Sequence, residues 1–134
     1  MAGRVHTKGL NHIRDTIFKG KAQQNLFLGL MTNATLPAVG DNLGSGITEI
    51  SGTGYSRIQI TNNTDWSALS DGVASMAQKQ FTAGAGGWAN VKGFFIATAS
   101  TGGDVLFTDI FATADQGNLS AGVIVKINCT LTFT

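Results

Sequence analysis

The last stretch of the chain, residues 122–134, has the most regular pattern of apolar and polar positions. Its alternating apolar residues are Val123, Val125, Ile127, Cys129, Leu131 and Phe133. Because successive side chains of an extended backbone leave opposite faces, a period of two predicts a strand with one face on a core and one in water. We therefore expect the five residues other than the cysteine to point into the core. Cys129, the only cysteine, shares their face and should behave as a small buried hydrophobe.

Helical spacing occurs once, near the N-terminus. The apolar residues that recur there on one helix face are Leu10, Ile13, Ile17 and Phe18, and we expect this stripe to be covered either by a partner or by the chain's own sheet. Thr7 is the expected N-cap and Gly20 supplies the stop, so the pattern predicts one amphipathic helix. Residues 1–6, which include Arg4 and His6, are expected to form a short mobile arm.

The remaining chain alternates between short strand-like runs and glycine-rich turns. Residues 25–32 are apolar on both faces, which predicts a buried strand, and residues 33–46 form a loop. The further runs with strand character are 47–50, 55–61, 74–82, 88–99, 104–113 and 122–134. About seven or eight short strands are typical of an antiparallel β-sandwich or jelly roll. We therefore predict a mainly β fold, with an N-terminal arm and helix at residues 1–20 and a β-sandwich domain at residues 21–134.

A glycine pair separates two of these strands. Gly52-Thr53-Gly54 is expected to form a hairpin turn with at least one glycine at positive φ. In the strand that follows, Ile58 and Ile60 should point inward and Arg57 outward. A nucleotide-binding loop is disfavoured, because such a loop needs a helix after it and a strand follows here.

Composition narrows the classes of partner. Charged residues make up only 13% of the chain, about half the usual share, and the net charge is +1. No basic run could neutralise several phosphates, so we expect no nucleic-acid partner. No apolar run approaches the ~20 residues of a membrane helix, and the first ten residues lack the apolar core of a signal peptide. We therefore expect the protein not to associate with a membrane. We also expect it to be synthesised in a cytoplasm.

Candidate chemistry is sparse. His6 and His12 are the only histidines, they share no helix face, and we expect both to be solvated rather than to form a metal pair. The carboxylates are scattered among turns, so we expect no catalytic residue, metal or cofactor, and the protein should not be an enzyme. Tyr55, Trp66 and Trp88 could stack a sugar ring, although each tryptophan lies near a strand end, where an aromatic ring commonly closes a core.

Two motifs carry a family resemblance. They are Glu49-Ile50-Ser51-Gly52-Thr53-Gly54-Tyr55-Ser56-Arg57 and Trp88-Ala89-Asn90-Val91-Lys92-Gly93-Phe94, and a strand led by Gly122 follows them. With these elements and the N-terminal helix, the chain resembles a set of small tailed-bacteriophage virion proteins over nearly its whole length. The resemblance implies a β-sandwich structural protein of the virion, made in the cytoplasm of the bacterial host. Some proteins of this appearance are called tail-fibre proteins, and others of this size and form are capsid cement or decoration proteins.

The lack of repeats or a coiled-coil stalk favours capsid decoration as the first hypothesis. In that role the partners would be the major capsid protein and copies of the chain itself, most simply in a homotrimer. The residues expected at the interface are Arg4, Leu10, Ile13, Ile17 and Phe18. The alternative is a tail-fibre or baseplate-associated module that binds carbohydrate through Tyr55, Trp66 and Trp88.

Overall fold

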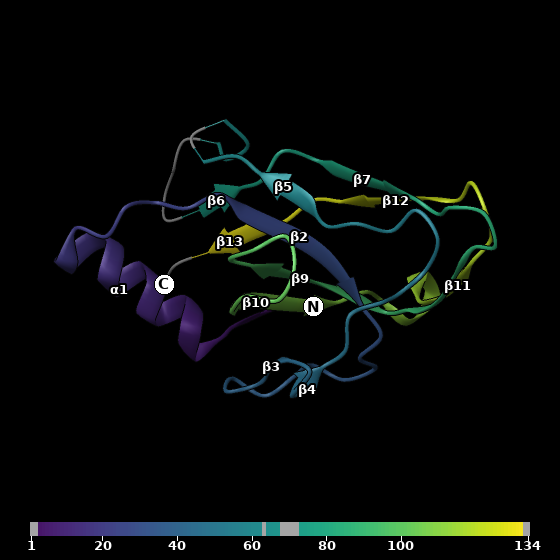
Figure 1. Cartoon of the computed structure of the whole chain (residues 1–134), viewed down its shortest axis with the longest axis horizontal. Coiled ribbons are helices and arrows are strands. Elements are labelled where there is room, and N and C mark those ends of the chain that lie inside the picture. Colours follow the sequence, from purple (N-terminus) through teal and green to yellow (C-terminus); the bar gives the residue numbers. More distant parts are fainter. Residues whose placement is uncertain (1–2, 63, 68–72, 133–134) are drawn as a thin grey trace.

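The computed structural model describes residues 3–62, 64–67 and 73–132 and shows a mainly β molecule with a helix at one end (Figure 1). Helix α1 spans Thr7–Lys19. The other elements are β1 (Arg4–Val5), β2 (Leu26–Met31), β3 (Asn42–Leu43), β4 (Gly46–Ile47), β5 (Ile58–Ile60), β6 (Val73–Ser75), β7 (Lys79–Thr82), β8 (Trp88–Val91), β9 (Gly93–Ala97), β10 (Val105–Ile110), the short 3-10 helix η1 (Thr113–Asp115), β11 (Gly117–Leu119), β12 (Ile124–Ile127) and β13 (Thr130–Thr132). Most predicted strands exist but are shorter, and the runs 74–82, 88–99 and 122–134 each break once. The strand predicted at 47–50 is wrong, because only Ile47 lies in a strand and Glu49 forms a single bridge with Met31.

A five-stranded antiparallel sheet lies at the centre, in the order β1-β10-β9-β2-β5. Strand β2 pairs with β9 on one side and with β5 on the other, and its last four residues are buried. The buried strand predicted at residues 25–32 is therefore confirmed. Gly29 in this strand leaves room for the ring of Phe95, because a Cβ there would lie 2.3 Å from a ring carbon.

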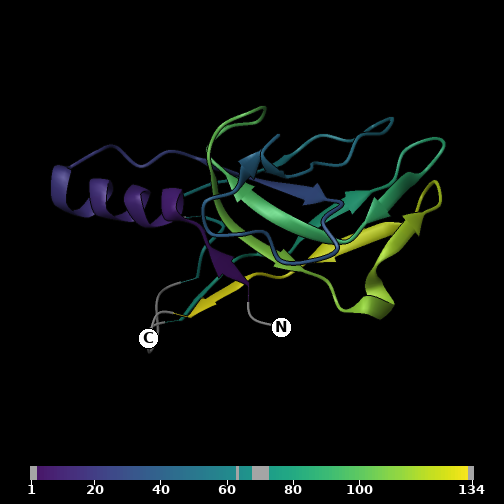
Figure 2. The same cartoon turned by 90° about the horizontal axis from the view of Figure 1, so that it is seen from below.

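A second layer covers one face of the sheet. The segment containing β6 and β7 pairs antiparallel with the segment containing β13 and β12, and β8 pairs with β11. Figure 2 shows the yellow ribbon of β12 and β13 running along the sheet toward the end of the molecule at which α1 lies. Its side chains meet those of the sheet in one core, whose central residues are Leu28, Leu30, Ile60, Phe81, Trp88, Phe94, Ile96, Ile127 and Cys129. This arrangement confirms the sandwich-like, mainly β prediction.

The long loop after β2 covers the opposite face of the sheet. It contains the short parallel pair β3 and β4, and it places Leu36, Leu43 and Ile47 over Met31 and Phe95. The expected loop is therefore a lid with its own apolar contacts. Both faces of the central sheet are dry at this point, which explains why β2 and β9 are apolar on both sides.

The alternation in the last strand is confirmed in its middle and wrong at its start. Ile127 and Cys129 are buried, and Val125 and Leu131 pack against the same core. Val123 is 40% exposed, because it lies in the turn before β12, where its N–H donates to Ser120 O. Phe133, which was also expected in the core, lies outside the described residues.

The N-terminal segment is not a mobile arm over its described part. Arg4 and Val5 form β1, which pairs with the edge of β10. The N-cap of α1 is His6 rather than Thr7, and it makes no side-chain capping bond. Gly20 ends the helix as predicted, since it adopts the left-handed conformation at φ 62° that glycine favours.

The glycine turn exists, but it does not close a hairpin. Tyr55 N donates to Gly52 O at 3.1 Å, and Gly54 has φ +77°. The segments on either side of this turn do not pair with each other as a hairpin would. Ile50 N donates to Leu30 O, and β5 also pairs antiparallel with β2, so both flanks continue the same edge of the sheet. The turn therefore interrupts a single edge strand. Ile50 before it and Ile58 and Ile60 after it all pack into the same core.

Candidate functional site

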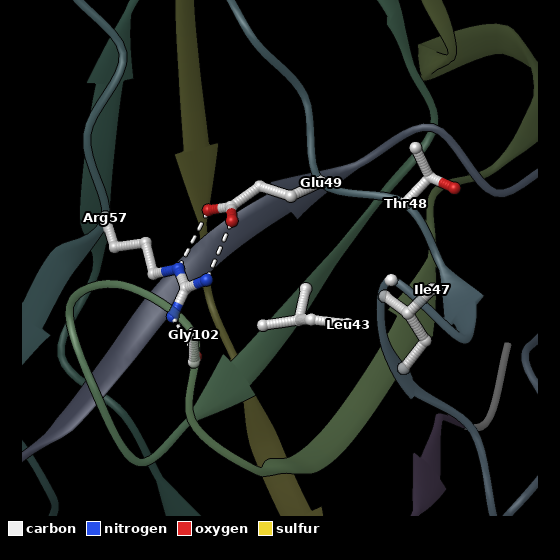
Figure 3. Close-up of a pocket in the computed structure, with 7 residues that line it drawn as sticks. Leu43, Ile47, Thr48, Glu49, Arg57 and Gly102 are labelled. Atoms are coloured by element: carbon white, nitrogen blue, oxygen red, sulfur yellow. Dashed lines mark hydrogen bonds and ion pairs between the residues drawn. The ribbon is translucent and has the colours of Figure 1, made fainter.

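The glycine motif brings its first and last charged residues together. Arg57 Nε and Nη2 donate to the two carboxylate oxygens of Glu49 at 2.8 and 2.7 Å, which is a bidentate ion pair (Figure 3). The hydroxyl of Tyr55 donates to Glu49 Oε1 at 2.8 Å and accepts the N–H of Leu30 at 2.9 Å. Burial raises the pKa of Tyr55, so its hydroxyl remains a donor at any ordinary pH. The network ties the turn to strand β2.

Arg57 also holds a loop from a distant part of the chain. Its Nη1 donates to Ala99 O at 2.6 Å and to Gly102 O at 2.8 Å, and its guanidinium carbon lies 5.0 Å from the centre of the Phe95 ring. Its side chain is only 3% exposed. The expectation that Arg57 points into water is therefore wrong, because the loop between β9 and β10 covers that face.

Two shallow pockets adjoin this ion pair. One, of about 260 Å³, lies between Leu43, Ile47, Glu49 and Arg57 (Figure 3), and the other, of about 410 Å³, lies between the turn at 51–56 and the loop at 100–102. Four hydrogen bonds already engage the guanidinium, and the carboxylate of Glu49 neutralises its charge. The arrangement therefore positions two loops, and its polar groups are committed to that task.

The residues expected to stack a sugar do not form an exposed platform. Trp88 is 3% exposed, its Nε1 donates to Thr53 O at 3.0 Å, and its ring contacts those of Tyr55 and Phe81 edge-on. The core interpretation of Trp88 is thus confirmed. Trp66 is half-buried and packs against the same core. Sugar stacking on Trp88 would require the core to open at this end.

Helix α1 carries four of the eight exposed large hydrophobic side chains in the described part of the chain. The exposed fractions of its stripe are 46% for Leu10, 38% for Ile13, 66% for Ile17 and 82% for Phe18. The helix packs on β10 through its first turn, where Gly9 lies against Leu106 O, and both views show it extending from one end of the sandwich (Figures 1 and 2). The stripe is therefore left for something outside the fold to cover.

Arg4 does not belong to this stripe. It lies in β1, and its Nη1 donates to Pro37 O, so it fixes the lid loop to the N-terminal segment. The helix itself carries Lys8, Arg14 and Lys19 against a single acid, Asp15. Asp15 pairs with Lys19 at 3.0 Å, and Lys8 pairs with Asp104 at 3.5 Å. Helix α1 therefore has three basic side chains against one acidic side chain, and two of the three basic ones are in ion pairs.

The two histidines do not converge. His6 is completely buried and His12 is half-buried on α1, so the expectation of two solvated side chains is wrong for His6. Across residues 3–62, 64–67 and 73–132, no group of three or more His, Cys, Asp or Glu side chains could hold a metal ion. Within the same residues, no helix is long and apolar enough to span a membrane.

The fold is mainly β, which agrees with the sequence resemblance to small β-sandwich proteins of phage virions. A family model described as Podophage GP4 fiber I protein gp80 matches residues 4–130, from β1 into β13. The chain belongs to this family. Comparison with curated proteins gave no match.

Proposed function

We propose that the protein is a structural component of a podophage tail fibre and acts through protein–protein contacts without catalysis. The observation that carries this proposal is the match of a fibre-protein family over residues 4–130. That match does not support the capsid-decoration hypothesis, and it fits the tail-fibre alternative better. The low charged fraction of the chain agrees with a surface that is buried against other protein at modest desolvation cost.

We propose that α1 is the element through which the protein assembles, and that its apolar stripe packs against the α1 helices of other copies of the chain. Leu10, Ile13 and Ile17 have the spacing of heptad positions a, d and a. Isoleucine at d with either leucine or isoleucine at a favours three or four helices over two, so a homotrimer is the simplest assembly. Burying a fully exposed side chain of this kind contributes roughly 1.5–3 kcal/mol to the free energy of association. A side chain that is already half-buried contributes only part of that amount.

Imaging of virions tests the location. An epitope tag on the chain, detected with gold-labelled antibody on intact particles, should mark the tail. Labelling confined to the capsid would overturn the fibre proposal. Untagged particles treated with the same antibody are the control for non-specific label.

The oligomeric state tests the role of α1. Native mass spectrometry of the isolated protein should give a trimer, and Ile17→Ser should give monomers with an unchanged fold, because Ile17 is 66% exposed. Asn11→Ser, an exposed polar position on the same helix, is the matched control and should remain trimeric. A wild-type monomer at micromolar concentration, or an Ile17→Ser trimer, would contradict assembly through this stripe.

A further inference from the structure

One buried imidazole sits where β1 ends and α1 begins. His6 is completely buried, its Nδ1 lies 3.1 Å from Asp41 O, and its Nε2 lies 2.9 Å from Thr108 Oγ1. A carbonyl oxygen can only accept, so Nδ1 carries the hydrogen and donates to Asp41. Nε2 is then the acceptor, and the Thr108 hydroxyl donates to it. In the neutral form, both ring nitrogens and the hydrogen of the Thr108 hydroxyl therefore have a partner.

A second proton would break this arrangement. With hydrogens on both nitrogens, Nε2 could no longer accept from Thr108, whose hydroxyl is also completely buried. The hydroxyl hydrogen would then need another acceptor in a dry site, and the imidazolium would have to be held away from water. Both changes penalise the charged form.

The imidazole joins three segments at the edge of the fold. Its own backbone N–H donates to Leu106 O of β10, and the neighbouring Thr7 N–H donates to Val39 O in the lid loop, both at 2.9 Å. The side-chain bond to Asp41 adds a second tie to that loop. We call β1, the first turn of α1 and residues 37–41 the N-terminal junction. It lies outside the core between the central sheet and the β6–β13 layer.

The charged groups around the imidazole act in opposite directions. Asp41, in the loop, favours the imidazolium, and Arg4, in β1, opposes it. Lys8 on α1 is paired with Asp104, and Asp109 on β10 accepts the N–H of Ile110. Desolvation is the largest influence, and it lowers the pKa of His6 below its ordinary 6.5. The N-terminal end of the helix dipole acts in the same direction as Arg4.

We propose that His6 is an acid-sensitive latch, whose protonation opens the N-terminal junction while the sandwich core stays folded. Because the folded state holds the neutral form, the latch contributes fully above pH 6.5 and weakens as the pH falls from 6.5 toward the lowered pKa. Within that pH range, each unit by which the pH falls should lower the hydrogen-exchange protection of the junction by up to tenfold. The junction fixes the orientation of α1 relative to the sandwich, so opening the junction would also free the helix to reorient.

A proton titration gives the first test. With only two histidines in the chain, ¹³C-labelled imidazole resonances can be assigned from His6→Gln and His12→Gln variants. The imidazole of His6 should titrate below pH 6.5. Titration of His6 at or above 6.5 in the folded protein would overturn the latch.

Hydrogen exchange measured by mass spectrometry at pH 7.5 and 5.0, corrected for the intrinsic rate at each pH, gives the second test. In the wild type and in His12→Gln, protection should fall at acid pH in peptides covering the junction and persist in β9. In His6→Gln the acid response of the junction should be absent. Equal protection at both pH values, or an equal loss in β9 and the junction, would overturn the proposal. If His6→Gln does not fold, the exchange patterns of the wild type and of His12→Gln at the two pH values still test the proposal.

Discussion

The Glu49–Arg57 pair permits the sharpest prediction of stability. Glu49→Gln keeps the shape of the side chain and removes its charge, while Arg57 stays ionised at 3% exposure. Breaking a buried ion pair by removing one partner costs about 3–5 kcal/mol. Glu49 is 26% exposed and Nη1 of Arg57 keeps its two carbonyl acceptors, so we expect a loss of about 2–3 kcal/mol in the free energy of unfolding.

Urea unfolding of a double-mutant cycle measures this effect. Arg57→Met keeps an alkyl stem over Phe95 but leaves the carboxylate unpaired, and the double variant leaves neither charge. The double variant should therefore be less destabilised than the sum of the two single variants, by about 1–3 kcal/mol. Lys8→Gln, which breaks the exposed pair with Asp104, is the matched control and should cost less than about 1 kcal/mol.

Two results would refute this reasoning. A cost of Glu49→Gln below about 0.5 kcal/mol would show that the buried guanidinium does not need its partner. Additive costs in the cycle would show that the two side chains stabilise the fold independently. An unchanged m-value would be needed in either case to attribute the result to the folded state.

Three further predictions concern other parts of the fold. Gly9→Ala should lower the melting temperature by an amount equivalent to about 1–3 kcal/mol, although alanine favours helices, because its Cβ would lie 2.4 Å from the backbone oxygen of Leu106; a higher melting temperature would contradict this packing. Burial raises the pKa of the Cys129 thiol to about 12, so iodoacetamide at pH 8 should label the unfolded chain and spare the native protein, and rapid native labelling would contradict the burial. The Lys79 ammonium lies 2.8 Å from Asp65, and together with the N–H of Thr61 it holds the pKa of the Asp65 carboxyl below 3.8. The ion pair therefore contributes its full stabilisation above pH 3.8, and this contribution decreases as the pH falls below 3.8. Asp65→Asn should flatten the dependence of the free energy of unfolding on pH below 3.8, and an unchanged dependence would refute the assignment.

Local patterns predicted the parts of the fold that local chemistry determines. The period of two fixed the face of Val125, Ile127 and Leu131, and Gly20 marked the helix end, because side-chain alternation and left-handed backbone are properties of a few adjacent residues. The prediction for Val123 was wrong because the alternation of apolar and polar residues does not show at which residue strand pairing begins. A turn precedes β12, and the side chain there has no opposite layer to meet.

Contacts between distant segments could not be read from the sequence. Arg57 does lie on the face opposite Ile58 and Ile60, but the loop that buries it comes 42 or more residues later. The same limit applies to His6, whose imidazole meets partners 35 and 102 residues away. A single histidine between Val5 and Thr7 has no periodic signal, so neither its burial nor its neutral form had a local signature.

The pairing of β1 with β10 has a consequence for synthesis. A ribosome adds about 5–20 residues per second, so the 102 residues between His6 and Thr108 take roughly 5–20 s to appear. During that time β1 has no ladder to join, and α1, with 13 residues, is too short to be more than marginally stable alone. The segment with β1 and α1 is made before β10 but is among the last to become ordered, and its apolar stripe reaches a fixed position only after most of the sandwich exists.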